Sequence, residues 1–277
     1  RISDGAVGRV LTIQADEFYY GGRTYFRRWN RLRAFGGGLW ITKASHDFDL
    51  LYWLAGSAPT RVTASARLTH YVAKPEAGSR CSDCPIEARC PDSHLKIDHA
   101  PIYRELTAIR EAAGWPPADL CLFNAEKDTF DHGMAQVEFA NRSLASYTVN
   151  VVSSFTDRRI RVAGDEGILE GRLSKEHAFY WKRHEVDQFK EYEEVPLSDP
   201  SAAGDMHGGG DQRILRSFAA FVRGEESEVV PPAEAAVAIA MGLSATYASD
   251  FGAAINLDAL KHWDEISGRL GRTKTVC

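Results

Sequence analysis

Hydrophobic and polar residues alternate along much of the first two thirds of the chain, as in strands with one buried face. Such segments are expected at 10–15, 61–69, 134–139, 143–152, 159–162, 168–173 and 179–182. Asn141–Arg142 separates two of them by a short turn, and Gly164–Gly167 forms another turn that can use positive φ at either glycine. Consecutive strands joined by short turns pair antiparallel, so the pattern predicts a large, mainly antiparallel sheet.

Apolar residues recur every three to four positions in three other segments, which predicts helices. One helix is expected over 43–55, ended by Gly56, another over 211–222 with Asp211 as its cap, and a third from Pro232 toward Asp250. This order fits an α+β fold in which helices pack on one face of a large, mixed open sheet. The segment 71–128 lacks clear periodicity and is too long for a loop, so it is interpreted as an insertion within one domain spanning 1–277.

Composition narrows the choice of partners. The chain is 44% hydrophobic and 26% charged, which is ordinary for a globular protein. Its net charge of -5 is spread without a long block of like charge, which argues against nucleic acid as a partner. The longest apolar stretch is interrupted by polar residues and glycine, which argues against a membrane span. Five cysteines without a visible leader segment indicate a reducing compartment, and the cytoplasm is therefore expected.

Candidate chemistry gathers after the glycines Gly36–Gly38. Lys43, His46, Asp47 and Asp49 fall in the first turns of the expected helix, with Lys43 and Asp47 as i,i+4 neighbours and His46 and Asp49 at i,i+3. A histidine can exchange a proton with a substrate hydroxyl near neutral pH, and a lysine can polarise a carbonyl. The alternative interpretation is an exposed Lys43–Asp47 pair beside a histidine with a structural role.

Three further segments combine residue types suited to a ligand site. Tyr25–Arg31 joins aromatic rings to guanidinium groups, which suit a sugar ring or a carboxylate, although a solvated basic segment has the same composition. Asp128 and Asp131 precede a strand and could face the same cleft or solvent. His207 precedes three glycines that allow close approach of the backbone to a ligand, or it belongs to an ordinary loop before a helix.

The insertion carries the spacing Cys81-x2-Cys84-x5-Cys90, and Cys121 follows later. Three or four of these thiolates, with His94 as an alternative fourth ligand, could form a tetrahedral zinc site, and an iron–sulfur cluster would use the same ligands. Free thiols or an occasional disulfide are the alternative.

Several separated segments resemble the Gfo/Idh/MocA oxidoreductases. Asp4–Val10 is similar to the entry into the second domain of that family, and Gly36–Leu54 is similar to its glycines, histidine and Asp-Leu-x-x-Trp-Leu helix. Gly164–Glu170 resembles its Gly-x-x-Gly-x-Leu-Glu sheet turn. The resemblance implies a dihydrodipicolinate-reductase-like C-terminal domain for substrate binding and oligomerisation, with the sheet mediating contacts in a homo-oligomer.

The resemblance also implies an activity: hydride transfer between NAD or NADP and a hydroxyl or carbonyl of a sugar, polyol or cyclitol. It makes His46 the acid or base, with Lys43 as its catalytic neighbour because Thr42 stands where many members carry an aspartate. By this resemblance Arg28, Trp29 and His207 would bind the substrate. The predicted substrate-binding residues also include Asp49, from its spacing to His46, and Asp131, from its place before a strand.

The family's nucleotide-binding half is expected to precede residue 1, and no Gly-x-Gly-x-x-Gly turn follows a strand in the sequence. No cofactor-binding residue is therefore assigned, and poor turnover is expected of this chain alone. The alternative function is a non-catalytic, metal-stapled binding or oligomerisation module. A related enzymatic alternative is NAD-assisted glycosidic cleavage.

Overall fold

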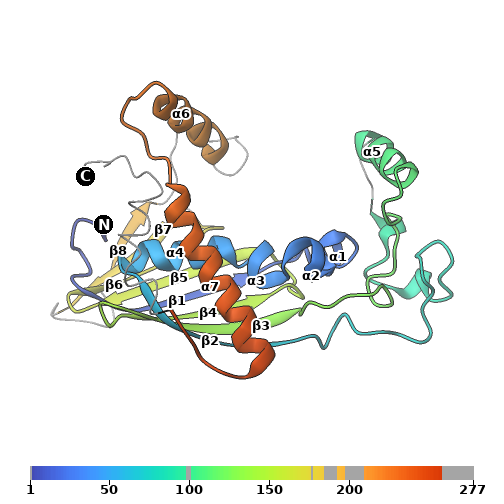
Figure 1. Cartoon of the computed structure of the whole chain (residues 1–277), viewed down its shortest axis with the longest axis horizontal. Coiled ribbons are helices and arrows are strands. Elements are labelled where there is room, and N and C mark those ends of the chain that lie inside the picture. The colour runs from blue at the N-terminus through green and yellow to red at the C-terminus, as the bar shows by residue number, and fades with distance from the viewer. Residues whose placement is uncertain (1, 98–100, 176, 184–191, 197–208, 258–277) are drawn as a thin grey trace.

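The computed structural model of the chain describes residues 2–97, 101–175, 177–183, 192–196 and 209–257 (Figure 1). Its strands are β1 (Val10–Phe18), β2 (Pro59–Arg67), β3 (His132–Phe139), β4 (Leu144–Asn150), β5 (Asp157–Gly164), β6 (Gly167–Arg172), β7 (His177–Lys182), β8 (Glu193–Pro196) and β9 (Ile255–Asn256). Its α-helices are α1 (Gly22–Tyr25), α2 (Arg33–Gly36), α3 (Leu39–Thr42), α4 (Ser45–Ala55), α5 (Pro101–Ala112), α6 (Gly210–Val222) and α7 (Pro232–Phe251). Three 3-10 turns are η1 (Trp29–Arg31), η2 (Glu87–Arg89) and η3 (His94–Lys96).

The described strands form one sheet in the order β8-β7-β6-β5-β1-β4-β3-β2-β9. β1 and β4 run parallel, with Ala15 opposite Tyr147, and each other pair is antiparallel. The parallel pair arises because the chain leaves β1 through short helices and returns through β2 and β3 before β4. The prediction of a mixed, mainly antiparallel sheet is confirmed.

Helices α3, α4 and α7 lie together over one face of the sheet (Figure 1). The strands show the matching alternation, since Ala135 and Val137 of β3 are buried while Met134 between its buried neighbours is 62% exposed. Trp40 of α3 is the centre of the core, with its ring 4.7 Å from that of Phe130. The α+β architecture with helices on one face is therefore confirmed for these three helices.

Close packing of two helices depends on one glycine. A Cβ atom on Gly242 of α7 would lie 2.8 Å from the carbonyl oxygen of Trp40, which is closer than real Cβ atoms approach. Trp40 Nε1 also donates a hydrogen bond of 3.0 Å to Ser249 Oγ on α7. Helix α7 is therefore held directly against α3 by close packing and a hydrogen bond to the buried tryptophan.

Several local expectations are corrected. The helix expected over 43–55 does not begin at Lys43, because α3 ends at Thr42 and Lys43 has φ -124° before α4 begins. The expected end is confirmed, since α4 is ended by Gly56, whose φ is 58°. The N-cap of α6 is Gly209 rather than Asp211, which lies in the first turn. Neither Gly164 nor Gly167 has positive φ; glycine is needed at 164 because a Cβ there would lie 2.0 Å from the Val7 carbonyl oxygen.

The segment 71–128 forms an arm that leaves the end of β2 and returns to the start of β3 (Figure 1). Among its described residues between 72 and 118, Cys81 and Ser93 are buried and the rest are partly or fully exposed. Helix α5 belongs to this arm; its apolar residues Ile102, Leu106 and Ile109 recur at helical spacing, a signal that the sequence contained and that was missed. The arm therefore has little hydrophobic core of its own.

Helix α6 stands apart from the sheet and has no buried residue (Figure 1). Across the described part of the chain, the helices are too short or too polar to cross a membrane.

Candidate active site

The first turn of α4 brings the predicted catalytic histidine to the surface. His46 is exposed there, and Asp49 follows three residues later on the same helix. Burial raises the pKa of the Asp49 carboxyl, and the nearby His46 lowers it in part. The two side chains therefore lie close enough to influence each other, as their i,i+3 spacing predicts.

Beneath this turn lies a network of buried charges. Lys43 Nζ is 2.9 Å from Glu17 Oε1, and Arg158 Nε is 2.8 Å from Glu17 Oε2. Arg158 also pairs with Asp47, and the Tyr147 hydroxyl donates a hydrogen bond of 2.7 Å to Asp47 Oδ2. Glu17 and Asp47 are 2% and 1% exposed, so two buried carboxylates face two cations.

The alternative interpretation, an exposed Lys43–Asp47 pair, is wrong. The break between α3 and α4 turns Lys43 toward Glu17 on β1, while Asp47 reaches Arg158 on β5. Glu17 and Arg158 were not identified from the sequence. A readable signal existed for Glu17, because it continues the inward positions Ile13 and Ala15 of its strand, and a charge at such a position needs a buried partner.

Burial controls the ionisation of this network. Burial raises the pKa of Glu17, and this effect outweighs the opposing contributions of Lys43 and Arg158. Burial also places the pKa of Tyr147 well above its usual value, so that hydroxyl remains a hydrogen-bond donor to Asp47 at neutral pH. The Lys43 ammonium lies 4.0 Å from the centre of the Tyr19 ring and is partly exposed, with 22% of its side-chain surface accessible.

Trp29 lies close to Thr42, the residue before Lys43. A Cβ atom on Gly36 would lie 2.8 Å from the Thr42 methyl group and 3.1 Å from the Trp29 ring, so Gly36 is sandwiched between them. The hydroxyls of Tyr25 and Thr42 are 2.7 Å apart. Arg28, beside Trp29, is exposed.

The predicted aspartates have structural contacts. Asp131 is 0% exposed and accepts hydrogen bonds from the backbone N–H groups of Thr69, His70 and Tyr71, and its Oδ1 is 2.7 Å from His132 Nδ1. Asp128 Oδ1 accepts the Arg33 N–H at 2.6 Å. A substrate-binding role for Asp131 stays a prediction. His207 lies outside the described residues, so its role also stays a prediction.

The four cysteines of the arm line one small cavity. Cys81, Cys84, Cys90 and Cys121 all border a space of about 20 Å³, and all four are free thiols. Within the described part of the chain, no group of three or more histidine, cysteine, aspartate or glutamate side chains is arranged to hold a metal ion. The zinc prediction therefore receives no support from this arrangement.

The described residues contain no parallel βαβ unit of the kind that carries a dinucleotide-binding turn. Within the described sheet the parallel pair is β1 and β4, and the chain between them passes through β2 and β3 rather than through a single crossover helix. A glycine-rich turn of a parallel βαβ unit is thus lacking there.

The fold defines the class of protein: an α+β domain with a mixed open sheet and helices on one of its faces. The family model described as the GFO/IDH/MocA C-terminal domain matches residues 1–170. The chain belongs to the GFO/IDH/MocA family.

Known proteins are similar to this chain in sequence or in structure. A putative oxidoreductase, YteT, of Bacillus subtilis (strain 168) is 28% identical over 245 residues, covering 78% of this chain and 55% of YteT. Levoglucosan dehydrogenase in complex with NADH and levoglucosan has a TM-score of 0.63 at 14% identity, over 92% of this chain and 61% of that one. An NAD binding oxidoreductase from Klebsiella pneumoniae gives 0.65 at 12% identity, over 92% and 61% of the two chains. The chain thus spans about half the length of its curated relative.

Proposed function

We propose that this chain forms the substrate-binding and sheet-forming half of an NAD(P)-dependent oxidoreductase that acts on a hydroxyl or carbonyl group of a sugar, polyol or cyclitol. The observation that carries the proposal is the exposed His46 on the first turn of α4, next in the chain to Asp47, which belongs to the buried network with Lys43, Glu17 and Arg158. A rigid base beneath an exposed histidine is what proton transfer at a fixed position requires.

In this proposal His46 takes the proton from the substrate hydroxyl, or returns it to the carbonyl oxygen. Asp49, one turn along the same helix, orients the imidazole of His46. Glu17 holds the Lys43 ammonium at 2.9 Å, so that Lys43 is positioned beside the reacting oxygen. NAD or NADP, when bound, would accept or supply the hydride.

The names of similar proteins support a small-molecule substrate of this kind. Levoglucosan dehydrogenase is described with NADH and levoglucosan, and another structure of similar fold is a putative myo-inositol dehydrogenase from Sinorhizobium meliloti 1021, with a TM-score of 0.54 at 18% identity. At such identities the similarity concerns the fold, so the substrate class is our inference. A reaction in the cytoplasm also stays a prediction.

The test uses the natural gene product that contains these residues. Absorbance of the reduced nicotinamide is followed with NAD⁺ or NADP⁺ and a panel of hexoses, polyols, cyclitols and anhydrosugars. Replacing His46 with alanine should lower kcat/KM by roughly 100-fold or more, the usual contribution of general acid–base catalysis. His177→Ala is the matched control, because His177 is exposed on β7. Unchanged turnover in His46→Ala excludes the proposed role.

A homo-oligomer formed through the sheet is a second part of the proposal. The sheet face opposite the helices carries Met134, Leu144 and Ile168, which are 62%, 51% and 38% exposed. Large exposed apolar side chains on a sheet face are typical of interaction surfaces. If the natural protein has no turnover on any such substrate but still oligomerises through this face, the alternative of a non-catalytic assembly module is favoured.

A further inference from the structure

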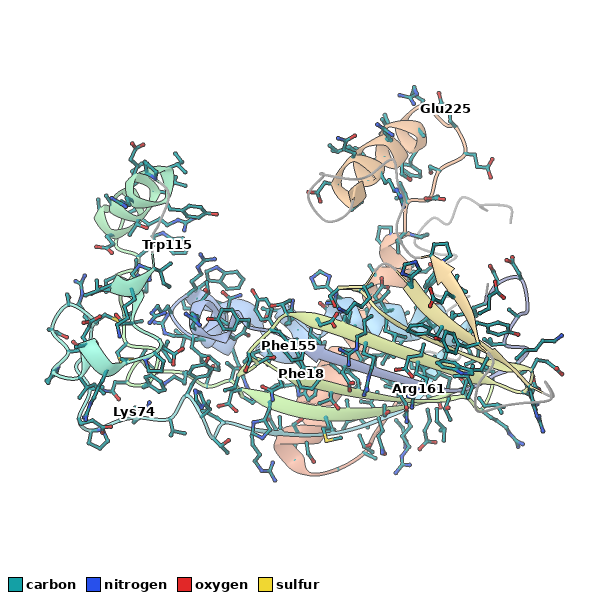
Figure 2. The ribbon with its side chains drawn as sticks, turned by 180° about the vertical axis from the view of Figure 1, so that it is seen from behind. Phe18, Lys74, Trp115, Phe155, Arg161 and Glu225 are labelled. Atoms are coloured by element: carbon teal, nitrogen blue, oxygen red, sulfur yellow. The ribbon has the colours of Figure 1, made fainter. Side chains whose placement is uncertain are left out.

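The arm and the Arg28–Trp29 segment enclose a cavity of about 230 Å³ that lies outside the proposed catalytic turn. One wall comes from the chain at the end of α1 and the start of η1, and the other from the end of α5 and the loop after it. The lining includes Arg28 and Trp29 on the first wall and Arg110, Trp115 and Pro116 on the second. Figure 2 shows Trp115 at the base of α5, on the side of the arm that faces the rest of the molecule.

Two arginines fix these walls relative to each other. Arg27, 7% exposed, donates from Nε to the Leu120 carbonyl oxygen at 3.2 Å and also donates to the Asp92 carbonyl. Arg31 Nε donates to the Glu126 carbonyl at 3.0 Å. Each of these bonds joins the segment before α2 to the arm, and Arg27 itself lines the cavity, so charge-assisted hydrogen bonds hold the two sides together.

The cavity combines aromatic faces with free positive charge. Trp29 and Trp115 are 40% and 51% exposed, which leaves flat apolar surface available to a ligand. The guanidinium groups of Arg28 and Arg110 have no side-chain partner among the residues that the structure describes. Glu111, the acidic residue in the lining, already accepts the Ala118 N–H at 2.9 Å. The Glu111 carboxylate keeps its negative charge in that bond, so the lining carries three positive charges, of Arg27, Arg28 and Arg110, and one negative charge.

Trp29 connects the cavity to the proposed catalytic surface. Its ring lines the cavity and also lies across Gly36 from Thr42, the residue before Lys43. Trp29 thus lies between the cavity and the segment that leads to Lys43. A volume of about 230 Å³ lies just below the range of about 300–1,000 Å³ typical of small-molecule sites, so it suits one part of a larger ligand.

We propose that this cavity is a subsite for an acidic saccharide, in which the sugar ring stacks on Trp29 or Trp115 and a carboxylate pairs with Arg28 and Arg110. Guanidinium groups match carboxylates in a bidentate geometry, and neutral sugars cannot use that match. The proposal rests on the proposed function for the choice of a sugar. It extends that function by making an oligosaccharide with a uronic acid residue the preferred substrate.

Binding is measured on the chain itself by titration calorimetry, which does not require turnover. The probes are digalacturonate and diglucuronate, each with its neutral disaccharide counterpart. At least one acidic disaccharide should bind 10-fold or more tightly than its neutral counterpart, and raised salt should reduce this preference. Trp115→Ala should weaken binding of both kinds, whereas Arg110→Gln and Arg28→Gln should weaken the acidic ligand 10-fold or more and leave the neutral one unchanged.

Matched controls are Trp53→Ala and Arg89→Gln, which replace exposed residues outside this cavity. Both should bind like the unmodified chain. The subsite is overturned if acidic and neutral disaccharides bind equally, if neither binds at 10 mM probe, if ADP binds more tightly than either uronate, or if the Trp115 and Arg110 variants bind normally. The assay of His46→Ala is separate. If the unmodified chain does not prefer uronates but His46→Ala lowers dehydrogenase activity, the subsite alone is rejected. If the chain prefers uronates but His46→Ala leaves dehydrogenase activity unchanged, the catalytic proposal alone is rejected.

Discussion

Removing the side chain of Asp131 should loosen the junction between the arm and the sheet. Its carboxylate accepts hydrogen bonds from three consecutive backbone N–H groups, those of Thr69, His70 and Tyr71, at 3.1, 2.7 and 3.0 Å. In Asp131→Ala each of these donors loses its acceptor, at a cost of about 1–3 kcal/mol for a buried group. Because Thr69 and His70 are exposed residues that water can reach, we expect a total loss of about 3–5 kcal/mol in the free energy of unfolding.

The variant Asp131→Asn keeps the shape of the side chain and removes its charge, so it measures the contribution of the charge alone. Its amide oxygen can still accept from His70 and Tyr71, but a neutral hydrogen bond contributes about 1 kcal/mol less than one to a carboxylate, so a loss of about 2 kcal/mol is expected. The free energies are measured by urea denaturation, with the slope checked for each variant. Glu126→Gln, at an exposed position before the same strand, is the control and should change stability by less than about 0.5 kcal/mol.

Two results would refute this reasoning. A loss of less than about 1 kcal/mol in Asp131→Ala would mean that the three N–H groups do not depend on the carboxylate. Weaker sugar binding in Asp131→Asn at unchanged stability would instead favour the substrate-binding role predicted from its position before a strand.

Two further predictions concern the arm. Burial alone raises the pKa of the Asp119 carboxyl, but hydrogen bonds from Arg80 and Ser82 outweigh it and hold the pKa below its usual 3.8. A carboxyl whose pKa is lower in the folded than in the unfolded state stabilises the fold at pH values above its unfolded pKa, and this stabilisation is lost as the pH falls through its folded pKa. The difference in the free energy of unfolding between the unmodified chain and Asp119→Asn should therefore be complete at pH 7 and shrink below about pH 3.8. A difference that stays constant in urea denaturation down to pH 3 contradicts the assignment. Because no metal-holding group is arranged among the described residues, elemental analysis of protein purified without added metal should find less than about 0.2 equivalents of zinc. A full equivalent of zinc that Cys84→Ser loses would contradict this expectation and support a zinc site at the cysteines.

The sequence alone determined the features that depend on local patterns. Alternation along the strands located seven of them, and the recurrence of apolar residues together with Gly56 and Pro232 located α4 and α7. These signals suffice because a strand or helix with one buried face must repeat its apolar residues at the period of its own backbone. The family motif likewise identified His46 as a candidate site residue from the sequence, because the residues of that motif are contiguous in the chain.

Only the tertiary structure decided the partners of those residues. Lys43 pairs with Glu17 and Asp47 with Arg158, across distances in sequence that no local pattern encodes, and the break before α4 overrode the expected Lys43–Asp47 pair. The cavity between Trp29 and Trp115 likewise exists because the arm returns to the start of the chain. Buried charges select partners by proximity in the folded core, and that proximity is set by the pairing of β1 with β5.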